Sequence, residues 1–598
     1  YLKTRELALD LGTLIKFIKT SQAKKWDSFV KACSGLDAES EFYKKFESAV
    51  QSEGMIDVFR NGFYANGKHF DICYFKPENK LNETALVNYS KNICHFVRQW
   101  HYSAKDTAKS VDVMLAVNGI PLAAVELKDP FTGQTVEDAK LQWMTDRDPK
   151  EAAFRLNHRL LVFFAVDLNE AWMTTALDGE KTRFLPFNQG SAGAGKDGGA
   201  GNPGFAGSAG IGPCAPTDYL WRDVLAKDSF LDIIQKFVNY EAKKRRIIFP
   251  RFHQLDVVRK LVADVREKGA GRNYLVQHSA GSGKSNSIAW IAYRLASLFT
   301  DDDKPVFNSV IIVTDRRVLD KQLQGTVMSF NPTLGEVAVI DEKKHAKDLL
   351  AAIDDGKRII VSTLQKFPVI FRDVKNVVGK SFAIIVDEAH SSQTGQSAAK
   401  LKVALGDLTD AIAEYEEETG KKIDKEDMSS PETQLALMMC THGKHKNLSY
   451  FAFTATPKDV TLDIFGTRQK NGSFRPFHTY SMRQAIEEGF IHDVLANYTT
   501  YKTCYQIVKA TKDNPEVPVS EAAKTIVRYK NLHPKNFMEK SAVIVDTFTS
   551  VTQTKYSDAK MMVVTESRRA AVRYFFALQE ALKERGKTDV KVMIAFSG

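Results

Sequence analysis

Apolar positions at helical spacing dominate the first fifty residues of the chain. One helical face carries Leu7, Leu11, Leu14, Ile15 and Ile18. Aromatic residues continue this pattern as far as Phe46. After Gly54 the pattern changes to short runs rich in β-branched and aromatic residues, which are typical of strands. The chain therefore predicts an amino-terminal helical segment that leads into a β-rich region.

A β-hairpin is the clearest element of this β-rich region. Two apolar runs, residues 111–117 and 122–127, flank the dipeptide Asn118-Gly119. Asn-Gly is strongly favoured in two-residue hairpin turns, because both positions need a positive φ angle. We therefore expect the two runs to pair as antiparallel strands.

Downstream of the hairpin, helix and strand patterns are mixed. Residues 136–144 have helical spacing, and residues 160–166 form an apolar run typical of a buried strand. Residues 190–212 are rich in Gly and Ala and predict a flexible loop, because they cannot bury enough apolar surface to order themselves. The basic run 243–246 is expected to be a solvated linker or, alternatively, a contact for DNA phosphates. We assign residues 1–245 to a first domain.

From residue 249 onward, strand patterns alternate with helical ones. Five short apolar runs predict buried strands at 274–277, 310–313, 359–362, 383–386 and 450–453. The alternation favours a parallel α/β sheet, whose ligands bind at the carboxyl ends of the strands. We assign residues 246–460 to this domain and 461–598 to a second, incomplete one. In the latter, strands are expected at 542–545 and 561–564, followed by an amphipathic helix.

Composition adds few restrictions. The chain has 598 residues, of which 43% are hydrophobic and 26% charged, and this length suggests about four domains. Its net charge of +10 favours a polyanionic partner such as nucleic acid. The six cysteines are scattered without paired spacing, which indicates reduced thiols and a cytoplasmic location. No apolar run reaches the ~18 residues that a membrane-spanning helix needs.

A nucleotide-phosphate site is predicted directly after the strand at 274–277. The loop there has the sequence Gly281-Ser282-Gly283-Lys284-Ser285. The glycines allow successive backbone N–H groups to turn inward, where they and the following helix N-terminus bind phosphate. The lysine adds positive charge at the β- and γ-phosphates, and the last serine is placed to hold Mg²⁺. His278 stands where the usual motif has its first glycine.

The predicted hairpin carries a second group of candidate residues. Side chains at i and i+2 share a face of a strand, so Glu126 and Lys128 are expected to point the same way while Leu127 turns to the core. Pairing about the Asn-Gly turn brings Asp112 near Glu126. Two carboxylates suit Mg²⁺, and the lysine can orient or deprotonate the attacking water. This layout predicts an Asp…Glu-x-Lys nuclease; a solvated ion pair on a sheet edge is the alternative.

Two further motifs follow predicted strands. They have the sequences Asp387-Glu388-Ala389-His390 and Thr454-Ala455-Thr456. Asp387 can hold Mg²⁺ through water, and Glu388 can polarise the water that attacks the γ-phosphate. The two threonines of the second motif are well placed to sense the γ-phosphate. Two nucleotide signatures, each after a buried strand, predict an ATPase.

With these motifs, the chain resembles a superfamily 2 helicase-type motor. The ordered set, with the Asp…Glu-x-Lys motif upstream, resembles the R (motor and cleavage) subunit of type I restriction endonucleases. The resemblance covers nearly the full chain. It is also carried by Asn118-Gly-Ile-Pro, Pro186-Phe-Asn, Tyr219-Leu-Trp, Val361-Ser-Thr-Leu-Gln365, Thr314-Asp-Arg-Arg-Val-Leu-Asp and Met482-Arg-Gln-Ala-Ile-Glu-Glu-Gly489.

The resemblance implies an α/β architecture. A restriction-endonuclease-like domain would occupy 1–245, a RecA-like lobe 246–460, and an incomplete second RecA-like lobe 461–598. It implies ATP-driven translocation on double-stranded DNA, Mg²⁺-dependent cleavage, and assembly with a DNA-specificity subunit and a modification methyltransferase. The later family motifs have no counterpart here, so we expect an amino-terminal fragment that binds nucleotide weakly and hydrolyses little.

The resemblance also extends the candidate sites. It implies that Gln254 reads the adenine base and that Gln142 belongs to the nuclease site, and His390 joins the nucleotide-binding set with the rest of its motif. Where the family tends to have a tyrosine four residues after the glutamine, this chain has Asp146. Ser391 likewise replaces a usual arginine.

Two other functions remain open at this point. One is the nuclease-fused helicase of a type III restriction system, although there the nuclease follows the motor. The other is a non-cleaving DNA-dependent ATPase or remodelling protein in which residues 1–245 are a scaffold.

Overall fold

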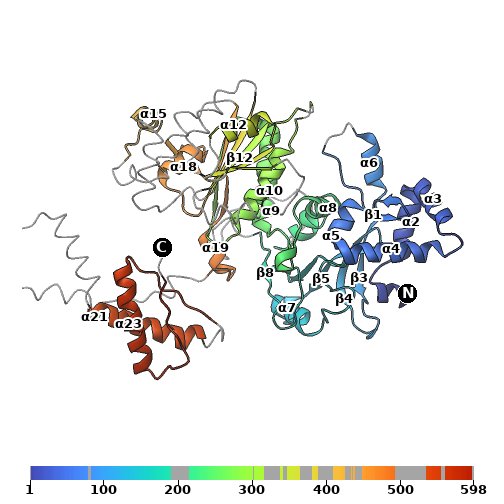
Figure 1. Ribbon diagram of the computed structural model, residues 1–598, viewed down its shortest axis with the longest axis horizontal. Helices are drawn as coiled ribbons and strands as arrows, with labels where there is room; N and C mark the ends of the chain where they lie inside the picture. Colours follow the sequence, from blue (N-terminus) through green and yellow to red (C-terminus); the bar gives the residue numbers. More distant parts are fainter. Residues whose placement is uncertain are drawn as a thin grey trace, which may run out of the picture. The chain divides into compact units, whose positions relative to one another are not determined.

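The computed structural model of the chain forms two compact units, Tyr1–His492 and Asp493–Gly598 (Figure 1). It describes residues 2–78, 82–189, 215–300, 302, 304–314, 327, 337–340, 346–363, 380–387, 409–423, 433, 436–437, 447–491, 534–553 and 559–595. The Gly- and Ala-rich stretch predicted as a loop at 190–212 lies outside these residues. None of the described helices is both long and apolar enough to cross a membrane.

The amino-terminal segment is helical, as its periodicity predicts. Its helices are α1 Leu2–Leu7, α2 Leu11–Ser21, α3 Ala23–Ala32, α4 Ala38–Glu53 and α5 Met55–Asn61. Their apolar faces meet in an aromatic cluster in which Phe29 and Phe42 are fully buried and pack edge to face at 5.9 Å. The small hairpin β1 Phe63–Ala65 and β2 Lys68–Phe70 closes this cluster through Phe70.

A six-stranded mixed sheet follows. Its strands are β3 Cys94–Trp100, β4 Val111–Val117, β5 Ile120–Leu127, β6 Val162–Val166, β7 Ala171–Thr174 and β8 Leu185–Pro186, in spatial order β3-β4-β5-β6-β7-β8. Only β5 and β6 run parallel, and helix α7 Val136–Thr145 lies in their connection. Trp143 fixes α7 to the sheet because its buried indole N–H donates to Phe164 O at 3.0 Å. The predicted hairpin, helix and buried strand are confirmed.

The hairpin turn explains why Asn118-Gly119 stands at this point. Both residues have positive φ angles, 52° and 82°. A Cβ atom on Gly119 would lie 2.2 Å from the backbone oxygen of Asp10, so a side chain does not fit. The buried Asn118 amide accepts from Ile93 N at 2.7 Å and donates to Ile72 O at 2.8 Å. The turn thereby joins the sheet to the helical segment.

The basic run at 243–246 is not a linker. Strands β9 Asn239–Glu241 and β10 Arg246–Ile248 pair as an antiparallel hairpin, with the 3-10 helix η4 Ala242–Lys244 between them. Glu241 pairs with Lys244 at 3.1 Å and with Arg246 at 2.5 Å. Backbone pairing and these ion pairs hold the run in place. Helix α6 Glu83–Ser90, the short helices η1 Pro130–Thr132 and η3 Leu220–Val224, and helix α8 Lys227–Lys236 complete this region.

The predicted motor region, from residue 246 to the end of the first unit, is built on a seven-stranded parallel sheet. Its strands are β11 Asn273–His278, β12 Ser309–Thr314, β13 Val337–Ile340, β14 Ile359–Thr363, β15 Phe382–Asp387, β16 Leu448–Thr454 and β19 His478–Tyr480, in the order β13-β14-β12-β15-β16-β11-β19. All five predicted strands are present. The sequence reasoning missed β13 and β19, the two short edge strands.

Helices cover both faces of this sheet, as a parallel sheet requires. Helix α10 Lys284–Ala296 packs on one face with α9 Phe252–Lys268 against it, and α12 Ala346–Asp354 and α18 Asp459–Phe465 pack on the other. Helix α15 Thr409–Thr419 packs on α18. The region also contains α19 Met482–Glu487 and the hairpin of β17 Thr467–Arg468 and β18 Phe474–Arg475. Because β19 pairs with β11, the sheet extends past the expected boundary at 460/461. The first compact unit accordingly ends at His492.

The two sheets of the first unit share one hydrophobic core. A single cluster of buried apolar side chains runs from the amino-terminal helices through the six-stranded sheet to α9, α10 and one face of the motor sheet. At the junction, Phe187 packs edge to face on Phe252 at 6.0 Å, and the Trp290 indole N–H donates to Phe237 O at 2.9 Å.

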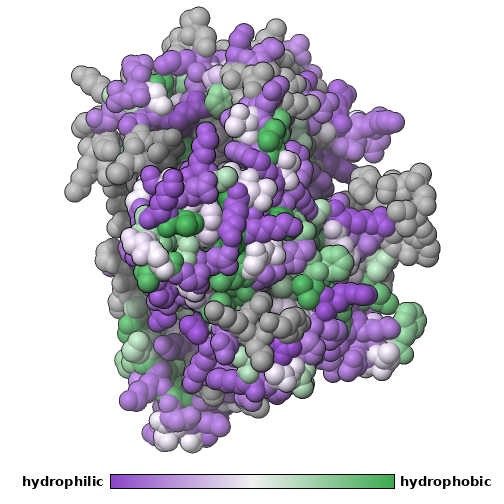
Figure 2. Space-filling model, turned by 90° about the vertical axis from the view of Figure 1, so that its right-hand side faces the viewer, coloured by the Kyte–Doolittle hydropathy of each residue, from purple (hydrophilic) through white to green (hydrophobic). Residues whose placement is uncertain are grey.

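The face of the molecule that Figure 2 shows is mostly hydrophilic, and the hydrophobic residues on it form small separate groups.

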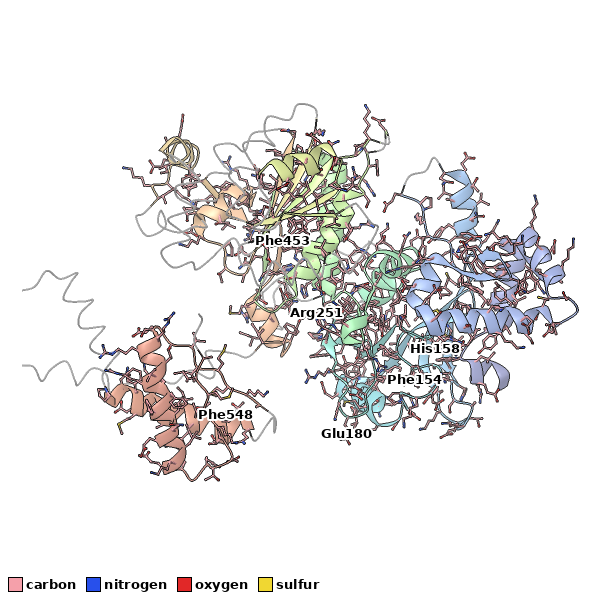
Figure 3. All side chains as sticks on the ribbon, viewed as in Figure 1. Phe154, His158, Glu180, Arg251, Phe453 and Phe548 are labelled. Carbon is pink, nitrogen blue, oxygen red and sulfur yellow. The ribbon has the colours of Figure 1, made fainter. Side chains whose placement is uncertain are left out.

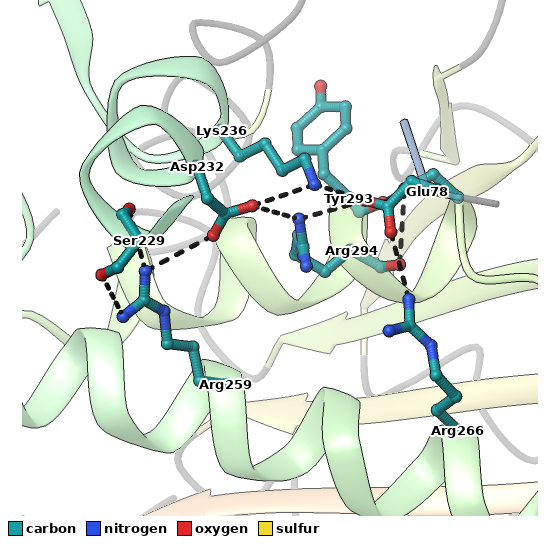
Figure 4. Close-up of polar contacts among 9 residues, drawn as sticks. Glu78, Ser229, Asp232, Lys236, Arg259, Arg266, Tyr293 and Arg294 are labelled. Carbon is teal, nitrogen blue, oxygen red and sulfur yellow. Dashed lines mark hydrogen bonds and ion pairs between the residues drawn. The ribbon is translucent and has the colours of Figure 1, made fainter. Parts of the chain in front are cut away.

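Ion pairs add a polar seam at the same junction (Figure 4). Glu78 lies in the segment before α6 and pairs with Arg266 of α9 at 3.1 Å and with Arg294 of α10 at 3.4 Å. Asp232 of α8 pairs with the same Arg294 at 3.2 Å and with Lys236 at 2.9 Å. Residues from the amino-terminal region therefore contact both helices next to the predicted phosphate site.

The described part of the second unit is helical. It contains α21 Pro534–Thr547, the π-helix η8 Phe548–Thr552 and α23 Arg568–Glu584. The amphipathic helix expected after Glu566 is confirmed as α23. The strand expected at 542–545 is wrong, because these residues lie within α21, and residues 561–564 form no strand. A RecA-like arrangement is thus not seen among the described residues of this unit.

Candidate nucleotide and nuclease sites

The predicted phosphate loop connects β11 to α10. Gly281 and Gly283 have φ angles of +74° and +81°, and Gly283 is the residue that caps α10. A Cβ atom on Gly283 would lie 2.5 Å from the Gln254 side-chain nitrogen. Glycine is therefore required there by both conformation and space.

The polar side chains of the loop fit a phosphate group. Lys284 is buried, and its ammonium group donates to His278 O at 3.5 Å. The Ser282 hydroxyl is buried and has no hydrogen-bond partner within the described ranges, so it can donate to a bound oxygen. Ser285 lies in the first turn of α10, half-buried. The helix N-terminus and these groups form a site for an anion.

Gln254 lies beneath the loop, on α9. Its carbonyl oxygen accepts from Arg251 N at 2.9 Å, and its amide nitrogen donates to Gly283 O at 3.0 Å and to Ser282 O at 3.3 Å. Both ends of the amide are thus engaged with protein backbone, and the side chain is 3% exposed. In this arrangement Gln254 holds the loop, and its reading of adenine stays a prediction.

His278, the departure from the usual motif, points into the core. Its Nε2 lies 2.8 Å from Nδ1 of His478, whose Nε2 lies 2.9 Å from Asp256. Burial, with nearby positive groups, holds the pKa of His278 well below its ordinary value, so the imidazole is neutral at neutral pH. Nearby His253 contacts Ser282 O at 3.0 Å. The loop therefore rests on a layer of histidines.

An arginine lies where the motor region meets the amino-terminal region (Figure 3). Arg251 donates to the Tyr480 hydroxyl at 2.7 Å and pairs with Glu488 at 3.1 Å. Its guanidinium also stacks over Phe490 at 4.0 Å. Sequence reasoning missed this network, because its members are brought together only by the fold.

The other nucleotide motifs end at the same edge of the sheet. Asp387 and Thr454 are the last residues of β15 and β16, and both are buried. The register pairs Asp387 with Phe453 and Thr454 with Gln277, so both lie at the carboxyl edge from which the phosphate loop leaves. Thr456 is exposed two residues beyond. Glu388 and His390 lie outside the described residues.

The candidate nuclease residues come together on the six-stranded sheet. The register pairs Val113 with Val125, and one step further sets Asp112 across from Glu126. Asp112 accepts from Leu127 N at 2.8 Å and from the Gln99 amide at 2.9 Å. Leu127 is 39% exposed, so the expectation that it turns to the core is wrong. At this end of β5, Glu126 lies on the buried face of the sheet and is fully buried.

Glu126 is fully buried, and its carboxyl group has an unusual environment. One carboxylate oxygen, Oε1, accepts from Arg147 Nε at 3.1 Å and from its Nη2, whereas Oε2 is buried without a hydrogen-bond partner in the part of the chain that is described. Burial raises the pKa of Glu126 to about 7; Arg147 opposes this effect and Asp112 adds to it. A divalent cation would satisfy Oε2 and relieve the repulsion between the carboxylates.

Lys128 and Gln142 complete the site. Lys128 Nζ donates to Gln142 Oε1 at 2.5 Å, which joins the end of β5 to α7. Among the described residues no group of three His, Cys, Asp or Glu side chains gathers as metal ligands. Asp112 and Glu126 would therefore supply two oxygen ligands, and a magnesium ion takes its remaining ligands from water or substrate.

Comparison with known proteins follows this division of the chain. Residues 16–186 match the family described as type I restriction enzyme R protein N terminus, and residues 253–525 match the SWI2/SNF2 ATPase family. Over most of its length, the chain is similar to the R subunits of type I restriction enzymes. The first match ends with β8 of the six-stranded sheet, and the second begins in α9, ahead of the seven-stranded sheet.

Relatives of the R-subunit family are distant in sequence. The chain is 23% identical over 531 residues to the type I restriction enzyme HindI endonuclease subunit of Haemophilus influenzae, covering 83% of this chain and 44% of that protein. It is 23% identical over 285 residues to the SauMSSORF170P endonuclease subunit of Staphylococcus aureus, covering 45% of this chain and 24% of that protein. The chain thus spans less than half the length of these relatives.

The solved structures that align with this chain include a type I restriction enzyme subunit and a helicase. An HsdR subunit fragment of a type I restriction enzyme from Vibrio vulnificus aligns over 80% of this chain and 66% of its own, at 16% identity and a TM-score of 0.30. The UvsW helicase of bacteriophage T4 aligns over 42% of this chain and 66% of its own, at 13% identity and a TM-score of 0.25.

Proposed function

We propose that this chain performs ATP-driven translocation on double-stranded DNA and Mg²⁺-dependent endonucleolytic cleavage, as the motor and nuclease part of a type I restriction-modification complex. The observation that carries the proposal is the row of Asp112 and Glu126 on neighbouring strands, with Lys128 beside them, in a region that shares its core with an ATPase sheet. One oxygen of the buried Glu126 carboxylate has no hydrogen-bond donor among the described residues, and burial and the neighbouring Asp112 both raise the pKa of Glu126. A cation held by both carboxylates would offset their repulsion and satisfy that oxygen.

ATP hydrolysis is proposed at the edge formed by β11, β15 and β16. The loop N–H groups, Lys284 and Ser282 would bind the phosphates, and Ser285 and Asp387 would hold Mg²⁺. Mg²⁺ held by these two residues would supply positive charge that offsets the negative charge of the phosphates. Glu388 would polarise the attacking water, and Thr454 and Thr456 would respond to the γ-phosphate.

DNA cleavage is proposed at the end of the six-stranded sheet. Asp112 and Glu126 would bind Mg²⁺, which when bound polarises the scissile phosphate and lowers the pKa of a coordinated water. Lys128 retains two N–H donors after its bond to Gln142, and these can orient the water or stabilise negative charge on the phosphate. Gln142 thereby fixes the direction of the ammonium group.

Partners and location follow from the same proposal. Double-stranded DNA would be held by phosphate contacts, in keeping with the net charge of +10. A DNA-specificity subunit and a modification methyltransferase would supply sequence recognition and modification. We place the complex in the cytoplasm; Cys33, Cys73 and Cys94 are free thiols in the structure.

The alternatives are less favoured. A type III system places its nuclease after the motor, whereas here the match at 16–186 precedes the one at 253–525. A non-cleaving remodelling ATPase does not need the carboxylate row.

Nicking of supercoiled plasmid in Mg²⁺ separates these functions. We expect wild-type chain to nick, and Asp112→Ala and Lys128→Ala to abolish nicking without changing the unfolding temperature. Nicking that is unaffected by both substitutions would refute the site.

A further inference from the structure

The two carboxylates of the nuclease site belong to a cross-strand row of three residues. In the register of β3 and β4, Arg98 pairs with Val113 and Trp100 with Val111, so Gln99 stands across from Asp112. Continuing into β5 adds Glu126. Gln99 has a φ of +49°, which takes its backbone out of the regular ladder. Such a conformation in a non-glycine residue persists only where its surroundings hold it, and it often accompanies a functional site.

Gln99 uses this conformation to contact Asp112. Its amide nitrogen donates to Asp112 Oδ1 at 2.9 Å, while its carbonyl oxygen accepts from the Ser110 hydroxyl at 2.9 Å. Both ends of the Gln99 amide thus have a partner. The amide nitrogen, and not the oxygen, therefore faces the Asp112 carboxylate. Asp112 Oδ2 is held separately by Leu127 N at 2.8 Å.

Arg147 holds the second carboxylate from the opposite side. It follows α7 directly after Asp146, the residue that departs from the family pattern. Its Nη2 donates to Ser110 O at 2.7 Å as well as to Glu126, and its Nη1 lies 3.4 Å from the Tyr102 hydroxyl. Its side chain is 3% exposed and lies against the rings of Tyr102 and Trp143. The guanidinium is therefore buried, and its hydrogen bonds and ring contacts fix its orientation.

Ser110 connects Arg147 to Gln99. Its backbone oxygen accepts from Arg147, and its hydroxyl donates to Gln99. The chain of contacts runs from Glu126 through Arg147, Ser110 and Gln99 to Asp112, and it leaves Glu126 Oε2 as the buried oxygen of the site with no hydrogen-bond partner within the described ranges.

We propose that Arg147 and Gln99 are positioning residues of the nuclease metal site, which hold Glu126 and Asp112 so that Glu126 Oε2 stays available to a divalent cation. This inference rests on the proposed nuclease function. Each residue would act through the carboxylate that it holds. Outer partners of this kind typically change metal affinity by about 10–100-fold when they are removed.

Binding of Mn²⁺ to the full 598-residue chain, measured by electron paramagnetic resonance without nucleotide or DNA, tests the proposal. Arg147→Met and Gln99→Asn should each weaken the Mn²⁺ binding that Asp112→Asn abolishes, by about 10–100-fold. Gln99→Asn is chosen because asparagine tolerates a positive φ but its shorter amide does not reach Asp112. Arg147→Lys keeps the charge with one point of contact and should give an intermediate loss. The control is Arg155→Met, an exposed arginine outside this network.

The outcomes are distinct. Unchanged or tighter Mn²⁺ binding in Arg147→Met and Gln99→Asn would overturn the proposal while leaving the nuclease function standing. If wild-type chain and Asp112→Asn bind Mn²⁺ equally, the nuclease site itself fails. Thermal unfolding identifies variants that do not fold; should Arg147→Met be one, wild-type affinity in Arg147→Lys would overturn the proposal.

Discussion

Buried charges in the amino-terminal region are held by partners of opposite sign. Arg159 is fully buried and donates to Glu47 at 2.6 Å, and Glu47 also contacts His158 at 2.5 Å. Burial alone would raise the pKa of Glu47, but the hydrogen bond from His158 and the charge of Arg159 outweigh it and bring the pKa to about 2. The ionised carboxylate is therefore part of the folded state.

Glu47→Gln should destabilise the first unit by about 3 kcal/mol at pH 7, since it leaves Arg159 buried without a counter-charge. The folded pKa lies below the ordinary value, so the contribution of Glu47 is complete above about pH 5 and declines as the pH falls toward 2. Urea unfolding of the wild type and of Glu47→Gln at pH 7 and pH 3 measures the difference in their free energies of unfolding. A stability difference that does not shrink at pH 3 would contradict the assignment.

Gln254 offers a second test at the level of a single side chain. Because its amide bonds to the loop backbone, Gln254→Ala should weaken binding of ATP and of inorganic tripolyphosphate by the same factor, about tenfold. Titration calorimetry with the two ligands measures it. A loss confined to ATP would instead show that Gln254 reads the base.

Residues within a contiguous motif were predictable, whereas residues joined by the fold were not. Lys284 and Ser285 stand at fixed spacing after a strand, so the sequence alone points to phosphate. Asp112 and Glu126 are linked by a turn whose geometry Asn118-Gly119 sets. Arg147 and Gln99 reach the site only through the sheet register and the packing of α7, which no local pattern encodes.

At the level of elements, the hairpin turn makes the sharpest prediction. Gly119 and Gly133 have nearly equal φ angles, +82° and +80°, but a Cβ atom would clash with Asp10 O only at Gly119. Gly133→Ala should therefore cost about 1 kcal/mol of unfolding free energy from backbone strain alone. Gly119→Ala should cost at least about 3 kcal/mol, because the backbone must also move. Equal losses in thermal and urea unfolding would show that the close approach to Asp10 is not tight.

Long buried strands were easier to predict than short ones. β12 and β15 are continuous apolar runs at the centre of the sheet, whereas β13 and β19 lie at its edges and have only four and three residues. The apolar run at 542–545 predicts a strand, yet these residues continue the helical pattern of α21. Periodicity cannot separate a buried strand from a helix segment of that length.

At the scale of the whole molecule, the shared core predicts that the nuclease and motor sheets unfold together. Phe46 is fully buried in the amino-terminal layer, and Phe46→Ala should cost about 3–5 kcal/mol. Hydrogen exchange in mild denaturant should then rise in β5 and in β11 alike, because one core cluster includes both strands. The matched control is Phe131→Ala, at a side chain that is 89% exposed. Loss of protection in β5 alone would show two independent cores.

We propose that one chain couples an ATP-driven motor to a metal-dependent nuclease. The most direct measurement is cleavage of a plasmid that carries the recognition sequence, by the full-length protein reconstituted with the proposed specificity and methyltransferase subunits, in ATP and Mg²⁺. We expect wild type to cut, Asp112→Ala to hydrolyse ATP without cutting, and Lys284→Ala to do neither. ATP-dependent cutting by either variant at the wild-type rate would contradict the account.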